Sequence, residues 1–159
     1  MRNMDVTDTV EILDYQPEHQ PWFENINRLW IEKYFAMEPI DFEVLQHPDV
    51  HIIDHGGNIL MVSLNKEIVG TVALKFVQPS VFELTKMGVL DKYQGKKLGK
   101  ALLLAAIDRA KQLGAHKVIL YSNTKLEIAI TMYRKLGFYE VPLDGPYKRS
   151  NIKMEMKLA

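Results

Sequence analysis

Hydrophobic and polar residues along the chain follow two periods, and each period predicts its own kind of element. Apolar residues at helical spacing predict three amphipathic helices, over 22–35, 97–113 and 124–137. Thr124 followed by Glu127 is typical of a capping box and predicts where the third helix begins. Alternating or continuous apolar runs bounded by turn residues predict strands at 10–15, 58–64, 67–77, 81–89, 116–121, 138–141 and 152–157.

The segments between these elements carry turn signals. They predict a loop over 37–41 (which contains Pro39), a helical turn over 42–46 and irregular structure over 47–57. The strand at 81–89 loses strict alternation around Thr85, Lys86 and Gly88, which predicts a β-bulge near its end. The order of elements is that of a mixed α/β (α+β) fold with a strand, a bulge, a glycine loop and a helix at its centre.

Length and composition restrict the class of protein. A chain of 159 residues can bury one sizeable core, so we expect a single domain over residues 1–159. Apolar residues make up 47% and charged residues 25%, which is typical of a globular protein. Lys plus Arg number 20, as do Asp plus Glu. Because a neutral chain has no global field to hold an anionic polymer or surface, we expect neither nucleic acid nor a membrane as partner.

The sequence also argues against secretion and against metal chemistry. The first twenty residues are polar and acidic, and the longest apolar run, 101–107, is far shorter than the ~18 residues that span a bilayer, so we expect a cytoplasmic protein. The absence of cysteine excludes disulfides and thiol nucleophiles. His51 and His55 would need a helix to share a metal ion, whereas Pro48 and Gly56 predict a loop, so no metal site is expected.

The segment 90–100 concentrates glycine and positive charge between the bulged strand and the second predicted helix. It holds the lysines Lys92, Lys96, Lys97 and Lys100. A helix start exposes unpaired N–H groups and the positive end of the helix dipole, which favour a phosphate. The glycine spacing fits neither a Walker loop nor a dinucleotide fingerprint. The segment is therefore either a solvated basic turn or a site for a different phosphate carrier.

The motif from Gln94 to Gly99 resembles the signature of the GNAT family of acyl-CoA-dependent N-acetyltransferases, which reads Gln or Arg, two residues, Gly, one residue, then Gly or Ala. Lys97 stands where the family usually has its first glycine. The resemblance extends over 58–141, about half of the chain. It implies a mixed, mostly antiparallel central sheet with a splayed strand pair, flanked by about four helices, and acetyl-CoA as cosubstrate.

The same resemblance implies where the cofactor binds. The pantetheine arm would pair with the backbone of Met87 and Val89, between the splayed strands. The pyrophosphate would be held by backbone amides of Gln94, Gly95, Lys96, Lys97, Leu98, Gly99 and Lys100. Asn123 would contact the cofactor arm or simply cap a helix, and Ala129 lies on the helix that would face the cofactor.

Two side chains are expected to carry the chemistry of acetyl transfer. A primary amine has a pKa near ~10 and must lose a proton before or during attack on the thioester. Glu83 stands where some family members carry a glutamate base, acting directly or through water, although a surface or salt-bridged glutamate on a half-exposed strand is an equal reading. Tyr133 matches the tyrosine that many members use to protonate the CoA sulfur. Attack would be direct, within a ternary complex.

The acceptor stays open at this point: a small amine, an amino acid, or a protein lysine or N-terminus. Glu38 and Asp41, beside the first helix, are candidates for attracting a cationic amine. A homodimer is possible. The alternative from another class is a noncatalytic acyl-CoA sensor or regulatory domain, which would need the 94–100 loop but neither Glu83 nor Tyr133.

Overall fold

The computed structural model describes residues 7–95 and 97–158. Within these ranges seven strands form one sheet, in the order β1-β2-β3-β4-β5-β7-β6. The strands are β1 (Val10–Asp14), β2 (Asn58–Leu64), β3 (Glu67–Gln78), β4 (Val81–Val89), β5 (Lys117–Ser122), β6 (Tyr139–Val141) and β7 (Ile152–Lys157). Neighbours pair antiparallel except β4 and β5, which are parallel. The mixed, mostly antiparallel sheet expected from the sequence is therefore confirmed.

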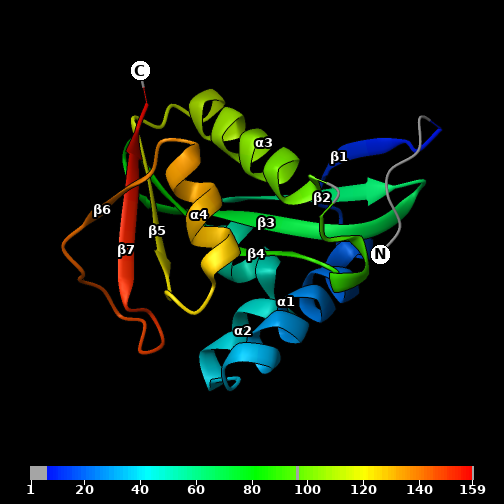
Figure 1. Cartoon of the computed structure of the whole chain (residues 1–159), viewed down its shortest axis with the longest axis horizontal. Coiled ribbons are helices and arrows are strands. Elements are labelled where there is room, and N and C mark those ends of the chain that lie inside the picture. The colour runs from blue at the N-terminus through cyan, green and yellow to red at the C-terminus, as the bar shows by residue number, and fades with distance from the viewer. Residues whose placement is uncertain (1–6, 96, 159) are drawn as a thin grey trace.

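Four α-helices flank this sheet in the described residues (Figure 1). They are α1 (Gln20–Tyr34), α2 (Pro39–Gln46), α3 (Leu98–Gln112) and α4 (Glu127–Lys135). Short helical turns are η1 (Pro17–His19), η2 (Asp49–Ile53) and η3 (Asp91–Tyr93).

Successive side chains of β2 lie on opposite faces of the sheet, so the hydrophobic core has two parts. Leu60 and Val62 belong to a cluster shared with α3 and α4, whereas Ile59 and Met61 pack with α1, α2 and η2 on the other face. Successive strand residues point to opposite faces, so a strand covered on both sides reads as one continuous apolar run. The helices therefore form two layers, and Figure 1 shows α3 and α4 together on one side of the sheet.

Two local predictions around α2 were wrong. The helix begins at Pro39 instead of Phe42, because proline at the first position of a helix lacks only an N–H that would be unpaired there. Glu38 and Asp41 close this end as a capping box. Residues 47–57 are also not simply irregular, since a π-helical turn forms over Asp49–Ile53.

The capping box predicted at Thr124 was also wrong. Helix α4 begins at Glu127, after Leu126, and no side chain caps it. The hydroxyl of Thr124 instead accepts a hydrogen bond from the side-chain amide of Asn151 at 3.0 Å. Thr124 therefore contacts a residue distant in sequence instead of capping the helix.

Strands β4 and β5 diverge after a short stretch of pairing. The parallel register joins Val81 to Lys117 and ends where Leu84 meets Leu120. Beyond it, Tyr121 and Ser122 pair only with β7, and β4 continues along β3. Figure 1 shows the two strands running apart from this point. The predicted splay is present, and within the described residues no strand pairs with this edge of β4 from 85 to 89.

Gly88 sets how closely α1 can approach β4. A Cβ atom on this residue would lie 2.8 Å from Cδ1 of Trp30 and 3.2 Å from Cγ2 of Ile26. We expect Gly88→Ala to push α1 away and to lower the free energy of unfolding by about 1–3 kcal/mol, measured by urea denaturation. Gly99→Ala is the matched control, because its Cβ would meet only the flexible side chains of Met132 and Met87 at 3.9 Å. Equal stability of the two variants would contradict this packing account.

Candidate active site

A cavity of about 780 Å³ opens where β4 and β5 separate. Its walls come from the end of α1, the second half of β4, the loop before α3, the end of β5, α4 and the β6–β7 connection. The predicted site residues among those lining it are Glu83, Met87, Val89, Gln94, Gly95, Lys97, Leu98, Gly99, Lys100, Asn123, Ala129 and Tyr133. Lys96, also predicted, lies outside the described residues. Residues spread over 51 positions of sequence thus share one cavity.

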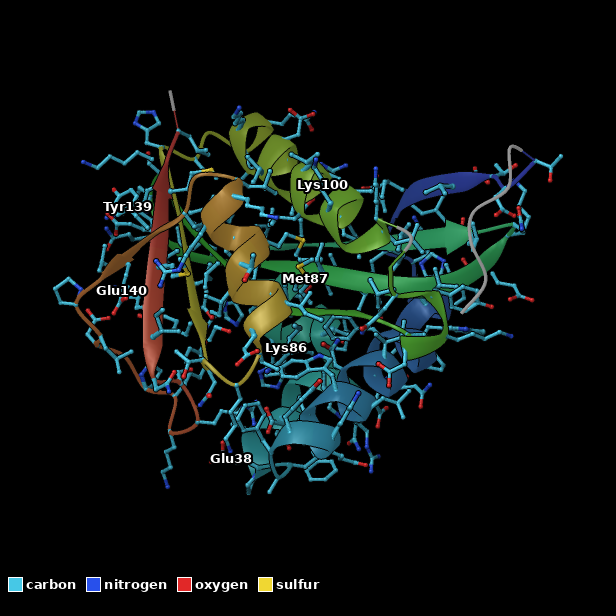
Figure 2. All side chains as sticks on the ribbon, in the orientation of Figure 1. Glu38, Lys86, Met87, Lys100, Tyr139 and Glu140 are labelled. Atoms are coloured by element: carbon cyan, nitrogen blue, oxygen red, sulfur yellow. The ribbon has the colours of Figure 1, made fainter. Side chains whose placement is uncertain are left out.

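The β-bulge lies on the cavity wall, as the broken alternation of β4 predicted. Thr71 pairs with Gly88 while Ala73 pairs with Thr85, so two residues of β4 face one of β3. Lys86 takes a left-handed φ of 50° there. A bulge re-aims the residues beside it. Figure 2 shows Lys86 and Met87 where β4 passes between α4 and α1.

The start of α3 is suited to an anion. The helix has no side-chain cap and no acidic residue in its first turn. Its first N–H groups are therefore unpaired within the helix and sit at the positive end of the helix dipole. Gly95 (φ 82°) and Lys97 (φ 64°) both take left-handed conformations, so the lysine occupies backbone that glycine adopts more easily. Lys97 and Lys100 add positive charge beside the start of this helix.

The side chain of Gln94 stabilises the loop before α3. Its side-chain amide lies 3.2 Å from the carbonyl oxygen of Val89 and 3.2 Å from a carboxylate oxygen of Asp91, and it donates to both. Its side chain therefore fixes the loop to the end of β4.

Glu83 lies on β4 and lines the cavity. Its side chain is buried, and its carboxylate accepts a hydrogen bond from the hydroxyl of Tyr147. Burial raises the pKa of Glu83, while the Tyr147 hydroxyl and the charges of Lys75, Lys86 and Lys153 oppose that rise. A carboxylate in such surroundings is a stronger base than one on the surface, so the surface reading of Glu83 was wrong.

Tyr133 lies on α4 between the core and the cavity. Its ring packs edge-on against Phe138, with the centroids 5.8 Å apart. Burial raises the pKa of Tyr133 to about 12, so the phenol is protonated at neutral pH. The side chain can donate a hydrogen bond or a proton to a group in the cavity.

Asn123 already has protein partners. Its Nδ2 donates to the carbonyl oxygen of Arg149 at 2.7 Å, and its Oδ1 accepts from the backbone N–H of Lys125 at 2.9 Å. It therefore stabilises the turn that leads into α4, although it lines the cavity and directly precedes the predicted Thr124 cap.

Glu38 and Asp41 do not serve as a free acidic patch, contrary to expectation. Asp41 is 1% exposed, and Arg149 donates to both of its carboxylate oxygens. The Nζ atom of Lys86 lies 3.4 Å from Oδ1 of Asp41, and Nη1 of Arg149 lies 3.5 Å from Oε2 of Glu38. Neither carboxylate is among the residues that line the cavity. Figure 2 places Glu38 on the side of α2, below Lys86.

Sequence reasoning did not single out three polar side chains of the cavity wall that matter for its chemistry: Lys86 as a charged group, Tyr147 and Arg149. The contact between Tyr147 and Glu83 spans 64 residues, and that between Arg149 and Asp41 spans 108. No local spacing rule connects residues so far apart. Only the Pro- and Gly-rich turn at 142–146 indicated that the chain changes direction there.

Two further properties concern only residues 7–95 and 97–158. No group of three or more His, Asp or Glu side chains converges there as metal ligands would. None of the helices in these ranges combines the length and the apolar character that crossing a bilayer demands.

The family of the chain follows from comparison with known proteins. Residues 22–138 match the model of the acetyltransferase (GNAT) family, and the chain belongs to that family. The crystal structure of a GNAT-family acetyltransferase from Staphylococcus aureus Mu50 superposes with a TM-score of 0.86 at 21% identity, covering 95% of this chain and all of the other. For the PaiA N-acetyltransferase from Thermoplasma acidophilum in complex with coenzyme A, the TM-score is 0.77 at 22% identity, covering 94% and 99%.

A sequence relative is the mycothiol acetyltransferase of Pseudarthrobacter chlorophenolicus. It is 41% identical over 73 residues, which are 44% of this chain and 23% of that protein. The match therefore concerns only a part of the longer relative.

Proposed function

We propose that the protein transfers an acetyl group from acetyl-CoA to a primary amine, by direct attack of the amine on the thioester in a ternary complex. The observation that carries this proposal is the cavity in the splay of β4 and β5, because one cavity combines an anion-binding helix start, an unpaired strand edge, a buried carboxylate and a buried phenol. Family membership and the coenzyme A complex of the Thermoplasma relative support it.

In this proposal the cofactor binds mainly to backbone. The pantetheine arm adds to the free edge of β4 beside Met87 and Val89, as an extended chain adds to a sheet edge. The diphosphate binds the N–H groups at the start of α3, with Lys97 and Lys100 next to it. A backbone amide at the bulge donates to the thioester oxygen as negative charge develops there.

Glu83 acts as the base in this proposal. It accepts the proton that the amine nitrogen loses during attack, directly or through one water. Its burial favours this role, because a carboxylate with a raised pKa holds the proton more strongly. The nitrogen then forms the amide bond, and the carbon–sulfur bond breaks.

Tyr133 would donate a hydrogen bond to the departing sulfur. An ordinary thiol has a pKa of about 8.5, well below the value of about 12 for Tyr133. Hydrogen bonding to the thiolate is therefore favoured over complete transfer of the proton. We expect Tyr133→Phe to lower kcat by about tenfold to 100-fold and to leave the Kd for acetyl-CoA within about twofold. Steady-state kinetics and calorimetric titration measure the two, and unchanged turnover would remove Tyr133 from the mechanism.

The proposed activity is tested by measuring CoA release from acetyl-CoA over a panel of amines. The panel includes small polyamines, amino acids, and peptides with a free lysine or a free N-terminus. Saturable CoA release that depends on one class of amine, with the acetylated amine identified by mass spectrometry, is the expected result. Saturable acetyl-CoA binding with no thiol released for any amine would contradict it and would favour a noncatalytic acyl-CoA sensor.

A further inference from the structure

Tyr147 is a polar residue of the cavity wall to which the proposed chemistry gives no role. It lies in the β6–β7 connection, and its ring packs edge-on against Tyr121 with centroids 5.1 Å apart. Its hydroxyl oxygen lies 3.0 Å from one carboxylate oxygen of Glu83 and 3.2 Å from the other. The hydroxyl therefore donates its single proton to the carboxylate that we propose as the base.

This hydrogen bond orients the carboxylate but does not use all of its acceptor positions. An ionised carboxylate offers about four lone-pair positions, and one hydroxyl proton uses only part of them. The remaining positions stay available to accept the proton of an amine or of a bridging water. Since Tyr147 also lines the cavity, its hydroxyl holds Glu83 from within the site.

The charges that act on Glu83 come from three strands of the sheet. Lys75 on β3, Lys86 on β4 and Lys153 on β7 each favour the ionised carboxylate, and burial opposes it. The hydrogen bond from Tyr147 is the largest of the influences that oppose burial. Tyr147 in turn faces Tyr121 and Arg149, and its own pKa is raised by burial and by Glu83, so it stays a donor at neutral pH.

We propose that Tyr147 is a positioning residue, which orients the carboxylate of Glu83 and keeps it ready to take the amine proton. The β6–β7 connection thereby completes the base, in addition to forming a wall of the cavity. This inference rests on the proposed function, because it assigns Tyr147 a role through Glu83.

Tyr147→Phe tests the inference, since it removes only the hydroxyl and keeps the ring that packs on Tyr121. Tyr139→Phe is the matched control, because Tyr139 also donates to a glutamate, Glu155, at 3.1 Å, but at the outer edge of the sheet (Figure 2). With the fastest acceptor of the amine panel, kcat/KM of Tyr147→Phe should fall about tenfold at pH 6 and less than about twofold at pH 9. The control should follow the wild type at every pH.

A double variant separates positioning from general destabilisation. If Tyr147 acts through Glu83, Tyr147→Phe should cause no further loss of kcat in a Glu83→Gln background. A loss that multiplies with that of Glu83→Gln would overturn the inference.

A second measurement needs no acceptor. In the full chain, labelled with ¹³C at the glutamate carboxyl carbons, the NMR titration of Glu83 is assigned by its disappearance in Glu83→Gln. Its midpoint should move to higher pH in Tyr147→Phe and stay in place in Tyr139→Phe. An unmoved midpoint overturns the inference even if the protein acetylates amines, whereas a moved midpoint without any acetyl transfer would leave the bond established and the proposed function wrong.

Discussion

Replacing Glu83 with glutamine is expected to lower kcat by about 100- to 1,000-fold at neutral pH. The amide keeps the size of the carboxylate and can still accept a hydrogen bond from Tyr147, but it cannot take a proton from the amine. The Kd for acetyl-CoA should stay within about twofold, because the predicted cofactor contacts are made by backbone on β4 and at the start of α3. Steady-state kinetics and calorimetric titration provide the two measurements.

The loss in Glu83→Gln should shrink as the pH approaches the pKa of the amine, near ~10, because the acceptor then loses its proton to solvent. Glu140→Gln is the matched control, since Glu140 lies on β6 at the outer edge of the sheet and pairs with Arg134 at 3.6 Å. A Glu83→Gln enzyme with more than half of the wild-type kcat at pH 7 would show that another group is the base.

Asp41→Asn is expected to cost about 3–5 kcal/mol of folding free energy, because it leaves two partly buried cations without their shared, buried anion. Arg149 and Lys86 both contact Asp41, and the side chain of Lys86 is only 12% exposed. For a chain of this length the loss corresponds to a fall in Tm on the order of 10 °C, measured by calorimetry. Asp14→Asn, which breaks the exposed pair with Arg109 at 2.8 Å, should cost at most about 1 kcal/mol.

The ion pairs of Asp41 also make the stability of the fold depend on pH in the acidic range. Burial alone would raise the pKa of Asp41, but the hydrogen bonds from Arg149 and from the Glu38 backbone, together with the charge of Lys86, lower it to about 2. The ordinary value is 3.8, so ionised Asp41 stabilises the fold above that pH and loses this contribution as the pH falls towards 2. Asp41→Asn should therefore flatten the loss of stability between pH 4 and 2, and an unchanged slope there, or a loss no larger than that of Asp14→Asn, would contradict the account.

The sequence predicted those parts of the fold that depend on local patterns. The bounds of β2, β4 and β7 agree with the expected strands, because their apolar runs end at clear turn residues. The bulge was predictable because broken alternation at Lys86 is a property of the strand itself. The predictions at Pro39 and Thr124 failed where one residue type fits two roles, and tertiary contacts decided between them.

The candidate site was likewise predictable only where it depends on local sequence patterns. The loop from Gln94 to Lys100 could be predicted because its motif is contiguous, whereas the residues expected along the splay came from the resemblance to the GNAT family. The partners of Glu83 and Asp41 were not, because Tyr147 and Arg149 come from the far end of the chain. A negative side chain in a segment predicted to be a loop, such as Asp41, cannot be distinguished from a solvated one until its neighbours are known.

A crystal structure of the protein with acetyl-CoA tests the central claim most directly. The account predicts that the pantetheine arm lies between β4 and β5, hydrogen-bonded to the backbone at Met87 and Val89, with the diphosphate at the first N–H groups of α3. It also predicts that the acetyl group lies within reach of the side chains of Glu83 and Tyr133. Cofactor bound elsewhere, or a diphosphate that makes no contact with the start of α3, would contradict it.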